Sequence, residues 1–103
     1  MLNGYMGKIL NVDLSTFKLE DEELQENIVR RFIGGYGLGA RTIFSRQKAG
    51  VAPLGPDNIL GILSGPLSGT RAVSGTRFAV VGKSPATGCW SDSNSGGYFS
   101  AYL

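Results

Sequence analysis

The sequence predicts an α+β fold, in which a mixed or antiparallel β-sheet is combined with two or three helices. Three observations lead to this class. Residues 5–20 alternate between apolar and polar side chains around a short turn, and residues 21–33 repeat apolar side chains with a helical period. Short apolar runs separated by glycine and proline then return after residue 58. Residues 1–103 are expected to form a single domain.

The composition is that of a globular domain and excludes several kinds of site. Hydrophobic residues make up 42% of the chain, charged residues 17%, and the net charge of +2 is too small to indicate nucleic acid or membrane binding. One cysteine and no histidine exclude an internal disulfide, histidine catalysis and a multi-cysteine metal cluster held by this chain alone. No signal peptide or membrane-length apolar run occurs, so a cytoplasmic location is expected.

The first expected element is a β-hairpin. Residues 5–14 form a strand whose alternate side chains point one way, and four of these five are apolar: Met6, Lys8, Leu10, Val12 and Leu14. Ser15 and Thr16 form the turn, and residues 17–20 pair back on the first strand.

A helix is expected over residues 21–33. Its apolar positions recur with a period near 3.6, which gives one apolar face made of Leu24, Ile28, Val29, Phe32 and Ile33. Acidic residues begin the segment and Arg30 and Arg31 end it, as the helix dipole favours. Gly34 and Gly35 then stop the helix.

Residues 35–40 fit the dinucleotide-binding pattern G-x-G-x-x-A only superficially. That pattern needs a strand before it and a helix after it, whereas here a helix comes first. We therefore interpret the segment as a corner between two helices. Leu38, Ile43 and Phe44 of the second helix are expected to pack on the core.

The second half of the chain reads as strands joined by glycine-rich loops. A proline-containing loop over 47–58 leads to a strand over 59–63, which is wholly apolar and expected to be buried on both faces. A loop of small residues over 64–76 follows the carboxyl end of that strand, a place that ligands favour in sheet proteins. Further strands are expected over 77–84 and 89–91.

Gly82, Lys83 and Ser84 resemble the end of a phosphate-binding P-loop, but two features argue against that motif. The first glycine of the motif would stand at position 77, which is arginine, and the segment has the pattern of a strand. A nucleotide-binding enzyme would need either this P-loop motif or the dinucleotide pattern at 35–40. Because both motifs are rejected, the sequence does not support a nucleotide-binding enzyme.

The candidate binding site is formed by residues 92–99 together with Arg77. Asn94 and Ser95 are good N-cap residues for a helix over 98–103, and Gly96 and Gly97 would let an anion such as phosphate approach the backbone. Arg77 begins a strand, and its guanidinium can bind phosphate through two bonds. If the strand that begins at Arg77 and the strand that leads into residues 92–99 are neighbours, the guanidinium of Arg77 and the backbone N–H groups lie at one end of the sheet. The alternative for residues 92–99 is an ordinary polar turn before a helix. The alternative for Arg77 is an ordinary surface arginine at a strand edge.

No catalytic constellation is apparent in the sequence. The acidic residues cluster in 20–26 on the expected first helix, and Asp57 and Asp92 are far apart, so paired-carboxylate catalysis is unsupported. Cys89 has no histidine to activate it, and we expect it to be a small buried hydrophobic residue.

Taken together, these motifs resemble the amino-terminal domain of the tungsten-dependent aldehyde:ferredoxin oxidoreductase family. The resemblance covers essentially all 103 residues, and it depends on the order and spacing of six segments: 5–16, 32–40, 53–58, 64–70, 83–85 and 93–99. It implies an α+β fold that corresponds to about one repeat of that domain, which looks like an internal duplication.

The resemblance also implies a function. The family oxidises aldehydes to carboxylic acids and passes electrons through a 4Fe–4S cluster to ferredoxin, with tungsten or molybdenum held by two pyranopterin dithiolenes. The resemblance places five residues at the pterin cofactor: Arg77, Asn94, Ser95, Gly96 and Gly97. It further makes the backbone carbonyl of Asn94 a ligand of a magnesium ion that bridges the two pterin phosphates.

The chain departs from the family pattern in length. The cluster cysteines and acid–base residues of the family lie beyond Leu103, and Cys89 matches none of them, so this chain alone is expected to be inactive. We expect a lone repeat to expose apolar surface, which a symmetric homodimer would cover. The alternative is a stand-alone structural or interaction module that kept the fold and lost the cofactor.

Overall fold

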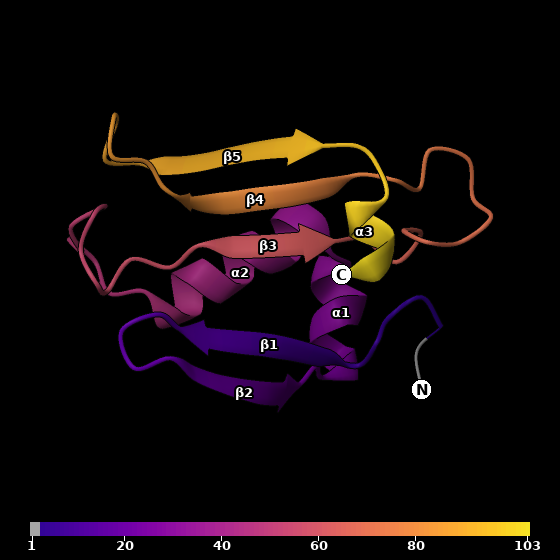
Figure 1. The fold of residues 1–103 in the computed structure, drawn as a ribbon, viewed down its shortest axis with the longest axis horizontal. Coiled ribbons are helices and arrows are strands. Elements are labelled where there is room, and N and C mark those ends of the chain that lie inside the picture. Colours follow the sequence, from indigo (N-terminus) through magenta and orange to yellow (C-terminus); the bar gives the residue numbers. More distant parts are fainter. Residues whose placement is uncertain (1–2) are drawn as a thin grey trace.

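A two-stranded hairpin, a three-stranded sheet and three helices make up residues 3–103, the part of the chain that the computed structural model describes (Figure 1). Both sheets are antiparallel, and the strand order in the larger one is β3-β4-β5. The predicted α+β class is therefore confirmed. In chain order the elements are β1 (Lys8–Asp13), β2 (Lys18–Glu23), α1 (Glu26–Phe32), α2 (Gly35–Arg46), β3 (Gly61–Ser64), β4 (Phe78–Lys83), β5 (Trp90–Ser95) and α3 (Phe99–Tyr102).

The predicted hairpin is confirmed, with Lys8 opposite Glu23 and Asp13 opposite Lys18. Its turn is held by Asp13, whose Oδ1 accepts hydrogen bonds from the backbone N–H groups of Ser15 and Thr16 at 2.8 and 3.1 Å. These two bonds stabilise the carboxylate and lower the pKa of Asp13. An aspartate that binds the backbone two and three residues on is a common way to close such a turn.

The second strand is longer than predicted, and the acidic residues 21–23 belong to β2 and not to the first helix. Two of them, Asp21 and Glu22, find partners that a helix start would not offer. Lys8 Nζ lies 2.7 Å from Asp21, while Glu22 accepts bonds from Asn11 at 2.9 Å and from Arg46 at 2.6 Å. The Asn11 amide first, and then the Arg46 guanidinium, lower the pKa of Glu22. Cross-strand pairing thus outweighs the helix dipole for these side chains.

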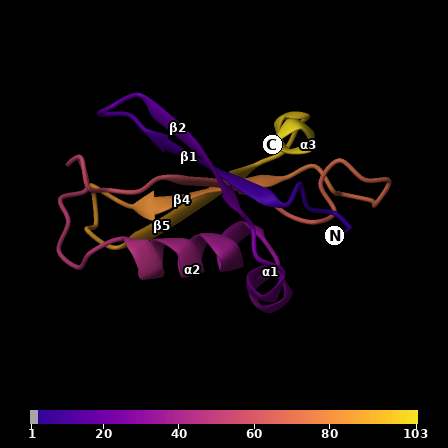
Figure 2. The same ribbon diagram turned by 90° about the horizontal axis from the view of Figure 1, so that it is seen from below.

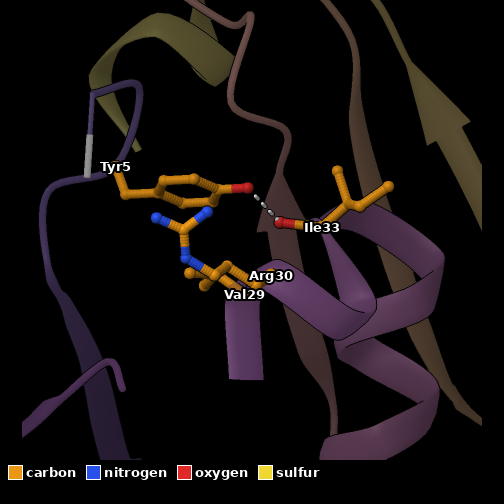
Figure 3. A pocket seen from close by; sticks show the side chains of 4 residues that line it. All are labelled: Tyr5, Val29, Arg30 and Ile33. Atoms are coloured by element: carbon orange, nitrogen blue, oxygen red, sulfur yellow. Dashed lines mark hydrogen bonds between the residues drawn. The ribbon is translucent and has the colours of Figure 1, made fainter. Parts of the chain in front are cut away.

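The joint between α1 and α2 is a strained turn. Ile33 has φ 63° and ψ −73°, and Gly34 N–H donates to the Phe32 carbonyl at 2.8 Å, which is the pattern of a γ-turn. The Tyr5 hydroxyl donates to the Ile33 carbonyl at 2.7 Å. Figure 3 shows this bond beside a pocket of about 300 Å³ lined by Tyr5, Val29, Arg30 and Ile33. Ile33 lies just beyond α1 and its side chain is exposed, so the prediction that it continues the apolar face of the helix is wrong.

The predicted second helix is confirmed as α2, which packs on one face of the larger sheet, and α1 lies against α2 on the same side (Figure 2). Leu38 and Gly39 are buried there. A Cβ built on Gly39 would lie 2.8 Å from Cγ2 of Val81 and 3.1 Å from Cδ1 of Leu63, so the glycine lets the helix approach β3 and β4 closely. Phe44 is 92% exposed, and its expected packing on the core is wrong because it lies beyond the buried stripe of the helix.

Only one face of the larger sheet is covered by these two helices. Ala79 and Val81 of β4 are buried beneath α2, as the alternation of this strand predicts. Leu60, just before β3, and Ile62 within it are 69% and 46% exposed, so the expectation that residues 59–63 are buried on both faces is wrong. A strand buried on both faces needs a second layer, and the described residues place no long helix on this side (Figure 2).

The long loop before β3 is anchored by side chains. The Gln47 amide oxygen accepts from Ile59 N–H at 2.8 Å, and Asn58 Nδ2 donates to the Pro53 carbonyl at 2.7 Å. Lys83 Nζ donates to the Val51 carbonyl at 2.8 Å. The ammonium of Lys83 therefore holds a loop, which agrees with the rejection of a P-loop at this position.

The chain exposes more surface than a closed domain of its mass. Its accessible surface is 7614 Å², whereas a compact monomer of 10.9 kDa exposes about 5,600 Å². Part of the exposed apolar surface lies on the sides of the hairpin and of the larger sheet that face away from α2. We call this the open face, and it comprises Leu10, Val12, Leu19, Leu60 and Ile62.

Candidate functional site

Arg77 and Asn94 meet at one end of the three-stranded sheet. Arg77 directly precedes β4, whose first residue, Phe78, stands opposite Ser95, the last residue of β5. Arg77 Nε donates to Oδ1 of Asn94 at 2.8 Å, and Nη2 donates to the same oxygen. The two strands are thus neighbours, and the arginine lies beside the polar segment as the sequence suggested.

Asn94 also binds a third side chain that sequence reasoning missed. Its Nδ2 donates to the hydroxyl of Tyr36 at 2.7 Å. Tyr36 lies in the first turn of α2, and Asn94, which stands opposite the buried Ala79, points to the same side of the sheet. A weak signal for this tyrosine was its place inside the glycine-rich corner 35–40, where glycines allow a close approach of the backbone.

Gly96 and Gly97 extend this site beyond β5. A Cβ on Gly96 would lie 3.9 Å from Nη1 of Arg77, and Gly97 has φ +109°, a conformation that L side chains rarely adopt. Within residues 3–103, the backbone N–H groups of Gly96 and Gly97 make no hydrogen bond. They are therefore donors that remain available beside a guanidinium group.

Ser95 is not brought together with the other predicted site residues. It alternates with Asn94 along β5, so its side chain lies on the opposite face of the strand, and its Oγ donates to the Gly96 carbonyl at 3.4 Å. The N-cap prediction for Asn94 and Ser95 is wrong as well. Both belong to β5 because β4 offers them a ladder, and the N-cap of α3 is Tyr98.

The loop after β3 supports the position of Arg77. The Ser68 hydroxyl donates to the carbonyl of Arg77 at 3.4 Å, and Gly65 N–H donates to Ser68 Oγ at 3.4 Å. The loop 64–76 therefore lies at the same end of the sheet as the arginine. This is where the sequence pattern placed it.

The groups that remain available at this end of the sheet are hydrogen-bond donors. Nη1 of Arg77 makes no hydrogen bond, and no carboxylate forms a salt bridge with its guanidinium, within residues 3–103. An unpaired guanidinium with adjacent backbone N–H groups is suited to the oxygen atoms of a phosphate. The site contains no nucleophile or acid–base pair.

The remaining candidate residues add no reactive group. Cys89 is exposed, so its expected burial is wrong; it lies in the turn before β5, where no helix covers it. Among residues 3–103 no group of three or more histidine, cysteine or acidic side chains could hold a metal ion. Over the same range, none of the helices has the length and apolar character that crossing a membrane requires.

Comparison with known families gives one match that spans most of the chain. The family model described as "Aldehyde ferredoxin oxidoreductase, N-terminal domain" matches residues 9–103. The tungsten-containing aldehyde ferredoxin oxidoreductases of Thermococcus kodakarensis and Pyrococcus furiosus are 43% and 42% identical over 100 residues. These matches cover 97% of this chain and 16% of each relative, so the chain spans about one sixth of their length.

Two further similarities concern proteins with different names. The aliphatic sulfonate oxidoreductase, WOR-like subunit, of Pyrococcus furiosus is 40% identical over 85 residues, which are 80% of this chain and 13% of that protein. Among solved structures, the active site complex BamBC of benzoyl coenzyme A reductase, in complex with 1,5-dienoyl-CoA, matches with a TM-score of 0.92 and 30% identity. That match covers 98% of this chain and 16% of the solved chain.

Proposed function

Since this chain belongs to the aldehyde ferredoxin oxidoreductase family and corresponds to its N-terminal domain, we propose that it binds the cofactor of a tungsten or molybdenum oxidoreductase. The observation that carries the proposal is the cluster of Arg77, Asn94, Gly96 and Gly97 at one end of the sheet. This cluster offers an unpaired guanidinium and backbone N–H groups to an anion. A bis-pyranopterin cofactor carries phosphate groups that such a site would hold.

The residues present fit the phosphate end of this cofactor. Arg77 would bind phosphate oxygens through Nη1, and the absence of a side chain at Gly96 keeps the approach to that nitrogen open. Gly97 adopts a backbone conformation that suits glycine. The backbone carbonyl of Asn94 would bind a magnesium ion, which would help to neutralise the charge of the cofactor phosphates. Ser95, whose side chain lies on the other face, would contribute through its backbone alone.

The cofactor would supply the redox chemistry, and this domain would orient it and neutralise its charge. A 4Fe–4S cluster would take its cysteine ligands from other parts of a family protein, because this chain has one cysteine. Oxidation of aldehydes to carboxylic acids, electron transfer to ferredoxin and a cytoplasmic location belong to the same proposal for the whole protein.

The relatives support a role in cofactor binding over one in substrate choice. Their names refer to aldehydes, aliphatic sulfonates and benzoyl coenzyme A, yet each contains a region similar to this chain. Groups that differ so much in size and charge are not selected by one shared surface. A shared cofactor site accounts for the similarity.

We expect replacement of Arg77 with alanine to weaken the binding of pyrophosphate, a minimal mimic of the cofactor phosphates. Charge-assisted hydrogen bonds would be lost, so the dissociation constant should rise roughly 10- to 100-fold. Isothermal titration calorimetry on the purified chain with pyrophosphate and magnesium measures this change.

Arg71→Ala is the matched control, since Arg71 is an exposed arginine in the loop that precedes Arg77. It removes the same charge and should leave the affinity unchanged. Equal losses in the two variants would mean that pyrophosphate responds only to net charge, and the proposed site would be wrong.

The open face supports a second function, that of an interaction module, and we propose a second copy of this chain as the partner. The surface of 7614 Å² exceeds that of a compact monomer by about 2,000 Å². If each of two copies buried that excess, the interface would total about 4,000 Å², which is typical of obligate dimers.

A further inference from the structure

Resting on the anion site proposed above, we infer that Tyr36 is its third side chain. It would act as a positioning residue, because its hydroxyl fixes the Asn94 amide and the amide in turn orients the guanidinium of Arg77. The three side chains form one chain of hydrogen bonds that joins the start of α2, the end of β5 and the start of β4.

The direction of these bonds follows from Arg77. A guanidinium group can only donate, so the Asn94 amide must turn its oxygen toward Arg77 and its NH2 group toward Tyr36. The Tyr36 hydroxyl therefore accepts, at 2.7 Å. Without this acceptor the NH2 group would lose its protein partner and the amide would be held at one end only.

Tyr36 is well placed to fix the site because its own helix is fixed. Three residues further along α2, Gly39 packs directly against Val81 and Leu63 of the sheet. The first turn of α2 thus has a set position relative to β4 and β5. Through its hydrogen bond, Tyr36 restrains the Asn94 side chain, which otherwise lies on an exposed edge strand.

The bond to Asn94 leaves the hydroxyl proton of Tyr36 unused. A phenol that accepts one hydrogen bond still has one to donate. An oxyanion bound at Arg77 would offer several acceptor oxygens on the same side of β5. Tyr36 thus has a donor for the ligand in addition to its hold on Asn94.

The test compares Tyr36→Phe with Tyr102→Phe. Tyr102 is 88% exposed, and its hydroxyl makes no hydrogen bond within residues 3–103, so its loss controls for removal of a phenol. We expect Tyr36→Phe to weaken pyrophosphate binding about three- to tenfold, the range that one hydrogen bond supports. Tyr102→Phe should match the original chain. Tyr36 is 41% exposed, so both variants should keep the original melting temperature.

A second readout needs no ligand. In the NMR spectrum of the free chain, the Nε–H proton of Arg77 should exchange with water slowly while Asn94 holds it. In Tyr36→Phe this exchange should become faster, whereas Tyr102→Phe should leave it unchanged. A merely structural role for Tyr36 would shift the melting temperature and not this single proton.

The two claims fail in different ways. If the original chain binds no pyrophosphate, or if Arg77→Ala binds it equally well, the proposed anion site is wrong. The exchange rate of the Arg77 proton in the free chain then still decides the positioning role. Unchanged proton exchange in Tyr36→Phe would overturn the inference about Tyr36, whatever the affinity for pyrophosphate.

Discussion

Replacing Gly39 with leucine is expected to destabilise the chain more than any other single change considered for the fold. A Cβ at this position would already lie 2.8 Å from Cγ2 of Val81 and 3.1 Å from Cδ1 of Leu63. The remaining carbons of leucine have no space, so α2 would have to lift away from β3 and β4. Overpacking of this kind typically costs about 1–3 kcal/mol, and we expect Gly39→Leu near the upper end because backbone has to move.

The small core makes this cost decisive. Among residues 3–103 only four hydrophobic residues are buried, namely Val29, Leu38, Ala79 and Val81, and two of them belong to β4 beneath this helix. Domains of this size have about 5–15 kcal/mol of stability in total. Lifting α2 would expose a large share of what stabilises the sheet.

Urea unfolding followed by circular dichroism measures the effect. Ala40→Leu is the matched control, because Ala40 is the next residue of the same helix and is exposed. It places the same leucine at an exposed position, and the helix propensity of leucine is close to that of alanine, so the unfolding midpoint should stay nearly unchanged. Equal midpoints for Gly39→Leu and Ala40→Leu would show that α2 does not pack on the sheet at this point.

Replacing Ile62 with lysine is expected to convert a dimer of the chain into a monomer. Ile62 lies on β3 in the open face, and its side chain is 46% exposed in the single chain. A lysine there would remain solvated in the monomer but would be buried without a partner in a dimer. Burying an unpaired charge costs about 3–5 kcal/mol, so the dimer dissociation constant should rise more than about 100-fold.

Sedimentation equilibrium at micromolar concentrations gives the mass of each variant. Phe44→Lys is the matched control, because Phe44 is 92% exposed but lies on α2, outside the open face. It should leave the dimer intact. A monomeric original chain would contradict the proposed dimer, and equal loss of the dimer in both variants would contradict the open face as the interface.

The sequence predicted the hairpin, the two main helices and β4 because their patterns reflect local geometry. Period-two alternation predicted which side chains of β1 share a face, and the glycines at 34 and 35 marked the boundary between α1 and α2. The prediction that residues 21–23 begin a helix is wrong because Asp21 and Glu22 pair with Lys8 and Arg46, which are distant in sequence. Local charge pattern favoured a helix start that the cross-strand pairs override.

The burial of a strand depends on layers that a sequence pattern does not specify. The run 59–63 reads as buried on both faces, yet among the described residues only the short helix α3 lies on the side of the sheet opposite α2, and it leaves Leu60 and Ile62 exposed (Figure 2). Phe44 was misplaced for a related reason. The sequence position of an apolar residue determines its angle around the helix axis, but not which side of the helix packs on the sheet.

The candidate site was partly accessible from the sequence. The sequence predicts that Arg77 and Asn94 share a site if their strands are neighbours, and the structure shows that they are. Gly96 and Gly97 were predicted there because glycine lets a ligand approach the backbone. Tyr36 could not be found in this way, because it lies 58 residues from Asn94 and is joined to it only through the packing of α2. The side chain of Ser95 was assigned to the site because a helix start was expected where β5 continues.

The measurement that tests the central claim most directly is an NMR titration of the labelled chain with pyrophosphate and magnesium. The proposed function predicts that the largest shifts fall on Arg77 Nε–H, on the Asn94 side-chain amide and on the backbone N–H groups of Gly96 and Gly97. The exposed cations at positions 48 and 71 should shift little. Shifts spread evenly over all the basic residues, or no saturable shift at Arg77, would contradict a cofactor-binding role for this end of the sheet.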